Sequence, residues 1–107
     1  YKKKGELNMS LNLALKVNDL DNVATIFANG ITDGTIIEVR DKKGNSENVK
    51  VIGDVPYGHK IAVKDIKKDE IITKYGEEIG IATADIKVGE YVHVHNLDSM
   101  RGRGDWK

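Results

Sequence analysis

The chain has 107 residues, in which 17 basic side chains balance 17 acidic ones. This length suits one compact domain, and the balanced charge provides no basic field for binding nucleic acid. The absence of net charge favours self-association, so a homo-oligomer or a bound partner is expected. Cysteine is absent, which excludes disulfides and thiolate metal sites. No apolar run has the length of a membrane span and no secretory signal follows the N-terminal lysines, so we expect a cytoplasmic protein without membrane contact.

The domain is expected to cover residues 10–98. Residues 1–9 are predicted to be an N-terminal extension, with Met9 as a candidate start residue. Residues 99–107 are predicted to be a flexible tail, because Arg and Gly alternate from residue 101 to residue 104.

The first half of the domain predicts short strands separated by turns. Residues 10–17 alternate apolar with small or polar side chains, which predicts a half-buried strand. Residues 23–27 follow a turn rich in Asn and Asp, and these cap-type residues predict a short helical turn. Residues 35–40 are rich in β-branched side chains and predict a strand. After a polar loop, residues 47–52 are expected to return as the second strand of a hairpin.

The second half predicts four more strands, at residues 59–63, 71–75, 79–84 and 91–95. Residues 65–70 resemble residues 85–90, and we interpret this likeness as one turn chemistry used twice rather than as a duplication. No segment sustains the 3.6-residue period of a long helix. The predicted fold class is therefore mainly β, a single compact domain of short strands with at most a short helical turn.

The segment that points most directly to function is the last predicted strand, where His93 and His95 lie two residues apart. Side chains at this spacing share one face of a strand, so we expect Val92 and Val94 to face the core and both imidazoles to face away from it. Paired imidazoles can bind a divalent metal or supply an acid, a base or a hydrogen-bond donor. The alternative is a solvated face with two incidental histidines. The position of His59, after a glycine turn in the same half of the chain, favours the functional interpretation.

Basic residues extend this set of candidates. Lys60 follows His59 and is expected to point to the opposite side of its strand, whereas Lys74 ends a strand at a turn. Lysines are more often solvated surface residues than ligand anchors. Arg101 and Arg103 carry fork-shaped donors suited to carboxylate or phosphate. The sequence contains no phosphate-binding loop, nucleophile elbow or dinucleotide fingerprint.

Several short motifs occur in a fixed order along the chain: Asp21-Asn22-Val23-Ala24, Val55-Pro56-Tyr57-Gly58-His59-Lys60, Lys74-Tyr75-Gly76, Ala84-Asp85-Ile86 and Val92-His93-Val94-His95-Asn96. Together they resemble the N-terminal SAF domain of the altronate/galactarate dehydratases, over roughly residues 12–105. In this family the domain also occurs as a free small subunit, and the alpha subunit of sulfolactate sulfo-lyase is related.

The resemblance implies a β-clip fold and a small subunit of a sugar-acid dehydratase, inactive without a large catalytic subunit. The implied reaction is loss of water from an aldonate such as D-altronate, giving a 2-keto-3-deoxy acid. The sulfo-lyase relative eliminates sulfite instead, so these motifs do not specify the leaving group. The family depends on a divalent metal, with iron expected, and the large subunit could supply most of its ligands.

The motif positions and the side-chain chemistry together give a set of candidate site residues. The catalytic candidates are His93, His95 and His59, and the first two are also candidate metal ligands. The candidates for substrate binding are Lys60, Lys74, Asn96, Arg101 and Arg103. Two alternatives to a lyase subunit remain open. One is a non-catalytic module that binds a sugar acid or serves in assembly, and the other is a purely structural module.

Overall fold

In the computed structural model, residues 12–99 are described, and within them the chain forms strands and turns without a helix. The mainly β, single-domain fold predicted from the sequence is confirmed. No helix long and apolar enough to cross a membrane occurs in the described part. The strands are β1 (Leu13–Leu15), β2 (Val23–Ile26), β3 (Ile36–Arg40), β4 (Ser46–Lys50), β5 (Lys60–Ala62), β6 (Ile71–Lys74), β7 (Glu77–Ala82), β8 (Tyr91–Val92) and β9 (Leu97–Ser99).

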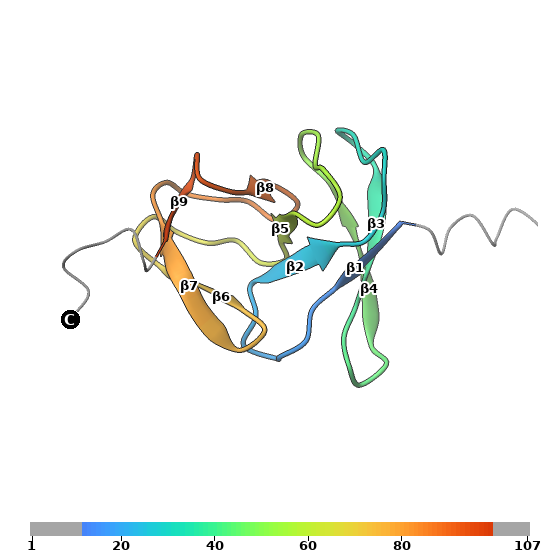
Figure 1. The fold of residues 1–107 in the computed structure, drawn as a ribbon, viewed down its shortest axis with the longest axis horizontal. Helices are drawn as coiled ribbons and strands as arrows, with labels where there is room; N and C mark the ends of the chain where they lie inside the picture. Colours follow the sequence, from blue (N-terminus) through green and yellow to red (C-terminus); the bar gives the residue numbers. More distant parts are fainter. Residues whose placement is uncertain (1–11, 100–107) are drawn as a thin grey trace, which may run out of the picture.

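The strands form two sheets. The larger sheet has the order β4-β3-β1-β2-β5-β8, with β1 and β3 parallel and its other neighbours antiparallel. The smaller sheet is antiparallel and has the order β6-β7-β9. Figure 1 shows β2 and β5 in the middle of the molecule, with β1, β3 and β4 on one side and the smaller sheet on the other.

The β2–β5 ladder separates two apolar cores. Ala24 and Ile61 point into the core that β1, β3 and β4 enclose, whereas Val23 and Ala62 point into the core that the smaller sheet covers. Successive strand residues face opposite sides, so this short ladder contributes to both cores. The two sheets therefore depend on the same pair of strands for their relative position.

The prediction of a helical turn at residues 23–27 is wrong. Val23–Ile26 is β2, it is fully buried, and it pairs with β1 on one side and β5 on the other. The β-branched Val, Thr and Ile side chains suit this buried, pleated position. The cap-type side chains before it are used differently, because Asp21 and Asn22 bind the backbone of segments that are distant in the sequence.

Each strand predicted from the sequence overlaps an observed strand, whereas β2 and β9 had no strand prediction. The predicted 47–52 hairpin partner is β4, in register with β3 from Ile36↔Lys50 to Arg40↔Ser46. β9 extends to Ser99, and the rest of the predicted tail lies outside the described residues.

One six-residue turn occurs four times in the described part, at residues 31–36, 55–60, 66–71 and 86–91. Each copy starts on a buried aliphatic residue, has a positive φ at its fourth position and leads directly into a strand or a strand-end residue. The copies pair through antiparallel bridges, Ile31 with Val55 and Ile66 with Ile86. The likeness between residues 65–70 and 85–90 therefore reflects a shared turn, as the sequence indicated.

The second pair of turns is nearly symmetric in its side-chain bonds. Asp65 Oδ1 accepts a hydrogen bond from the Val88 amide at 3.0 Å, and Asp85 Oδ1 accepts one from the Lys68 amide at 2.9 Å. These reciprocal bonds connect the two turns on both sides of the buried Ile66–Ile86 bridge. The glycine at the fourth position of the last copy, Gly89, also packs directly against the end of β4.

Gly89→Ala should destabilise the domain much more than Gly44→Ala. Both glycines have a left-handed backbone, with φ of 94° and 91°, so each substitution costs about 1–2 kcal/mol from the backbone alone. A Cβ on Gly89 would lie 2.1 Å from the Lys50 carbonyl oxygen, whereas one on Gly44 would meet nothing within 4 Å. We expect at least about 2 kcal/mol of additional loss for Gly89→Ala, measured by urea unfolding. Equal losses in the two variants would contradict this packing.

Candidate functional site

The segment that carries His93 and His95 is a turn rather than a continuous strand. β8 ends at Val92, and residues 93–96 turn back before β9 begins at Leu97. Val92 is buried as predicted, but the prediction that Val94 faces the core is wrong, because its side chain is 77% exposed. The histidines are therefore presented at the tip of a turn on the β8 edge of the larger sheet.

Asn96 holds the turn that follows β8. Its buried side chain accepts a hydrogen bond from the His93 amide at 2.9 Å and donates one to the Tyr91 carbonyl at 2.9 Å. The Asn96 amide also donates to the His93 carbonyl at 3.0 Å, which closes the turn. Both ends of the Asn96 side chain thus bind the backbone, so this residue positions the histidines and leaves few polar groups for a substrate.

All three histidines of the chain gather around Tyr91. The Tyr91 hydroxyl lies 2.8 Å from His59 Nδ1, and the two ring centroids are 5.6 Å apart. The His93 ring stacks parallel to the Tyr91 ring at 5.7 Å, and the His95 ring lies tilted at 5.4 Å from it. His59 and His93 also meet directly, with ring centroids 4.8 Å apart. The structure therefore brings the three predicted catalytic residues together, and we call Tyr91, His59, His93 and His95 the imidazole cluster.

His59 joins this cluster because its turn differs from the other three. At the equivalent fifth position, Thr35, Glu70 and Glu90 each accept a hydrogen bond from the backbone amide three residues earlier. In the turn at residues 55–60 that earlier residue is Pro56, which has no amide hydrogen. The side chain of His59 is thus not needed to bind a backbone amide of its turn, and its Nδ1 forms a hydrogen bond with the Tyr91 hydroxyl instead.

Lys60 lies beside the imidazole cluster, and Lys74 lies beside Lys60. Lys60 is half-buried in β5, opposite Thr25 and Val92, and Lys74 ends β6. Burial, and after it the charge of nearby Lys74, lowers the pKa of Lys60 below its ordinary 10.5. Neither lysine forms an ion pair within residues 12–99. Two neighbouring cations without a counter-ion form a site that favours an anion.

Tyr75 completes the lysine side of the site. Its ring lies 5.2 Å from Lys74 Nζ, and its hydroxyl donates a hydrogen bond to Thr25 Oγ1 at 3.1 Å. This bond ties the turn after β6 to β2, and so it holds Lys74 near β5. The predicted substrate-binding residues Lys60 and Lys74 are therefore neighbours, whereas Arg101 and Arg103 lie outside the described residues.

The imidazole cluster and the lysines form one electrostatic unit. Partial desolvation, and after it the charges of His59, Lys60 and His95, lowers the pKa of His93 below its ordinary 6.5. Since several of these groups repel added positive charge, the neutral form of His93 is favoured more than in an isolated histidine. A neutral imidazole can accept a proton, which suits a base in proton transfer.

The described residues do not form a complete metal site by themselves. No group of three or more His, Cys, Asp or Glu side chains within residues 12–99 could hold a metal ion. His59 Nδ1 is occupied by its bond with the Tyr91 hydroxyl. His93 and His95 would supply at most part of a coordination sphere, and the remaining ligands would have to come from elsewhere.

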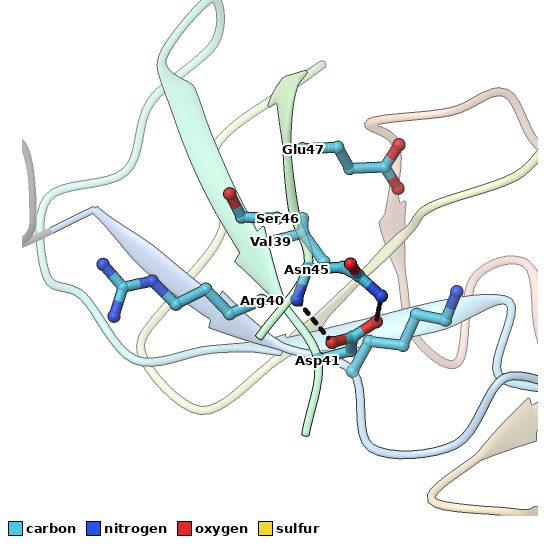
Figure 2. A pocket seen from close by; sticks show the side chains of 7 residues that line it. Val39, Arg40, Asp41, Asn45, Ser46 and Glu47 are labelled. Atoms are coloured by element: carbon cyan, nitrogen blue, oxygen red, sulfur yellow. Dashed lines mark hydrogen bonds between the residues drawn. The ribbon is translucent and has the colours of Figure 1, made fainter. Parts of the chain in front are cut away.

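A shallow pocket of about 200 Å³ lies at the opposite edge of the larger sheet, where β3 and β4 meet. Figure 2 shows the polar groups that line it, with Asp41 bonded to Asn45 through both the backbone and the side chain. These bonds close the hairpin loop and satisfy its carboxylate. The pocket is therefore a feature of the loop, separate from the imidazole cluster on β5 and β8.

Sequence reasoning missed Tyr91, although it contacts every histidine. One signal could have found it, because Tyr91, His93 and His95 occur at alternate positions in the predicted strand. The contribution of Thr25 could not be found in this way, since it depends on the pairing of β2 with β5.

A family model for the altronate/galactarate dehydratase SAF domain matches residues 12–100. The altronate dehydratase of Escherichia coli strain K12 is 42% identical over 100 residues, which are 87% of this chain and 19% of that protein. The altronate dehydratase of Bacillus subtilis strain 168 is 38% identical over 85 residues, 79% of this chain and 14% of that protein. The chain thus spans a fifth or less of these enzymes. The (2R)-sulfolactate sulfo-lyase subunit alpha of Chromohalobacter salexigens is 34% identical over 88 residues, 79% of this chain and 93% of that subunit.

In solution, His93 should titrate below pH 6.5. Partial desolvation and the neighbouring positive charges both disfavour its protonated form. The variant His59→Gln removes one of these charges, so the midpoint of His93 should rise while staying below 6.5. NMR titration of the ring protons of His93 measures this shift. Lys67→Met is the control, and it should leave the midpoint unchanged, whereas a His93 midpoint above 6.5 in the native chain would contradict the proposed environment.

Proposed function

Because this chain belongs to the altronate/galactarate dehydratase SAF-domain family, we propose that it acts as the small subunit of a sugar-acid lyase. In this role it contributes part of the active site to a larger catalytic subunit and is inactive alone. The match to 93% of a separate alpha subunit supports the division into subunits. The match to 19% of a longer altronate dehydratase supports the need for a much larger partner region.

The observation that carries this proposal is the imidazole cluster next to Lys60 and its neighbour Lys74, two lysines that form no ion pair within residues 12–99. Elimination from a sugar acid requires a base for the proton next to the carboxylate and an acid for the leaving hydroxyl. It also requires a cation that holds the carboxylate. The imidazoles of His93 and His95 can exchange protons with the substrate, and Lys60 and Lys74 can bind its carboxylate.

The metal belongs to the partner in this proposal. A divalent metal would act as a Lewis acid on the leaving group, and iron fits the family resemblance. Residues 12–99 lack a complete set of ligands for it. The chain's own residues therefore bind and orient the carboxylate end of the substrate and handle protons there, while the large subunit holds most of the metal ligands.

A second candidate is the alpha subunit of a sulfolactate sulfo-lyase. The nearly full-length match to such a subunit favours it. The two candidates share a carboxylate to be anchored and a proton to be removed, and they differ in the group that leaves. A lyase assay distinguishes them, since a dehydratase releases a 2-keto-3-deoxy acid from an aldonate and a sulfo-lyase releases sulfite from sulfolactate.

The chain co-expressed with its large subunit should eliminate from one member of a panel of aldonates, galactarate and sulfolactate. His93→Ala and His95→Ala should each lower kcat about 100-fold or more, because a proton-transfer group is lost. Lys60→Met and Lys74→Met should raise KM about tenfold, with a smaller change in kcat. Lys67→Met, an exposed lysine on another turn, is the matched control.

Unchanged turnover in both histidine variants would remove the imidazole cluster from the reaction. Binding of a sugar acid by the chain alone, with no partner recovered from the native source and no elimination, would favour the non-catalytic binding module.

The exposed tip of the histidine turn supports a contact with the large subunit. Val94 stands between the two histidines with 77% of its side chain exposed, although no packing within the described chain requires an apolar residue there. We propose that Val94 enters an apolar site on the large subunit, which brings the imidazoles against the rest of the active site. An apolar side chain that becomes buried on binding contributes to affinity through the hydrophobic effect.

Val94→Asp should weaken the complex at least about tenfold, because the interface would have to bury an unpaired carboxylate. Leu20→Asp is the matched control, since Leu20 is 72% exposed on a different turn. It should leave the dissociation constant unchanged in sedimentation or calorimetric titration. Equal weakening by both variants, or by neither, would show that the histidine turn is not the contact surface.

A further inference from the structure

Tyr91 is the residue on which the imidazole cluster is built, yet neither the motifs nor the chemistry assigned above gives it a role. Its ring is the common neighbour of His59, His93 and His95, at centroid distances of 5.6, 5.7 and 5.4 Å. Loss of this ring would leave the three imidazoles without their shared support.

The Tyr91 ring is itself held in place by the apolar core. Tyr91 pairs with Ile61 in the β5–β8 ladder, and its ring packs against the core that contains Ile61. Its carbonyl oxygen accepts the hydrogen bond from Asn96 that closes the histidine turn. The backbone of Tyr91 therefore fixes the turn, while its ring supports the side chains that the turn carries.

The hydroxyl has a more specific consequence. The Tyr91 hydroxyl lies 2.8 Å from His59 Nδ1. Within the described chain, this contact is the hydrogen bond of the Tyr91 hydroxyl and also that of the His59 ring. A neutral imidazole carries its proton on one nitrogen and accepts at the other. A phenol hydroxyl is a better hydrogen-bond donor than acceptor, so a phenol at Nδ1 favours the tautomer with the ring proton on Nε2.

We propose that Tyr91 is the positioning residue of this site: its hydroxyl donates to Nδ1 of His59 and so places the ring proton of His59 on Nε2. His59 then presents an N–H donor to the bound substrate, suited to a hydroxyl or carboxylate oxygen. Since Nε2 carries the proton, His59 is not a metal ligand in this arrangement. This inference rests on the proposed function for the identity of the ligand, whereas the tautomer itself does not depend on it.

The arrangement also gives the histidines different tasks. Nδ1 of His59 is bound to a phenol, so this ring is fixed in direction and in tautomer. Within residues 12–99, His93 and His95 contact Tyr91 through ring packing and not through a hydrogen bond. Their nitrogens can therefore take up a proton, a ligand, or a metal whose other ligands come from the partner. In such a site, His59 can bind one oxygen of the substrate as a fixed donor, while His93 and His95 remain free to transfer protons at the reacting carbon or at the leaving group.

The test uses the full 107-residue chain and long-range proton–nitrogen NMR correlations of the histidine rings, recorded above the pH at which they titrate. In the native chain, the nitrogen shifts of His59 should show a single tautomer with the proton on Nε2. In Tyr91→Phe, which keeps the ring and loses the hydroxyl, the two nitrogen shifts should move toward each other as the second tautomer becomes populated.

Tyr57→Phe is the matched control. Tyr57 is also a tyrosine, two residues before His59, and its ring packs edge-on against Phe27. Removing its hydroxyl should leave the His59 shifts unchanged. A proton on Nδ1 of His59 in the native chain, or identical His59 shifts in Tyr91→Phe and the native chain, would overturn the proposal.

Activity provides a second measurement, made on the complex of both subunits. Tyr91→Phe should lower kcat about tenfold, with KM nearly unchanged, because His59 still meets the substrate but no longer in one tautomer. The thermal unfolding midpoint should stay close to that of the native chain, which separates positioning from folding. If the native complex eliminates from no substrate of the panel, the proposed function fails, while the NMR result still decides the role of Tyr91.

Discussion

The relative position of the two sheets depends on one buried carboxylate in addition to the β2–β5 ladder. Asp21 is fully buried and accepts hydrogen bonds from the amides of Val17, Asn18 and Gly76, at 3.1, 3.0 and 2.8 Å. Burial alone would raise the pKa of Asp21, but the amides of Asn18, Gly76 and Val17 together lower it below its ordinary 3.8. The carboxylate is therefore charged and satisfied at neutral pH, and removing its partners would leave a buried charge without compensation.

Asn22 extends this connection along β6. Its side chain accepts from the Thr73 amide at 2.8 Å and donates to the Ile71 carbonyl at 3.0 Å. Asp21 and Asn22 thus bind the β6–β7 hairpin at its turn and along its edge, and this contact sets where Lys74 lies relative to Lys60. The lysine side of the candidate site is consequently a result of how the two sheets are joined rather than of any local motif.

How much of this could be predicted from the sequence depends on the range of the interactions. The strands with alternating or β-branched residues were predicted, because those patterns reflect local propensity and one buried face. β2 was mistaken for a helical turn, since its strand character comes from neighbours on both sides. The strand that begins at Tyr91 is shorter than its alternating pattern predicts. The side chain of Asn96 binds the backbone of Tyr91 and His93, and this turns the chain after Val92.

The site shows the same division. The histidine pair was recognisable from its spacing, and Lys60 and Lys74 from their place beside turns. Their proximity was not, because it arises from bonds between residues about 50 positions apart, such as Tyr75 to Thr25. Tyr91 was recognisable in principle, but an aromatic residue at the start of a strand is usually a core residue, and here the ring serves both the core and the site.

The clearest link between fold and function lies in the repeated turn. In three copies, the side chain at the fifth position binds the backbone of its own turn. In the copy at residues 55–60, the residue that would supply the backbone donor is Pro56. This change costs the turn one hydrogen bond and releases His59 for the cluster. Proline at the second position of a turn restricts the backbone, so the turn can form without a bond from its fifth side chain. The proline therefore supports a site role for His59 independently of the His-Val-His motif, and it explains how this copy of the turn can carry an imidazole at its fifth position.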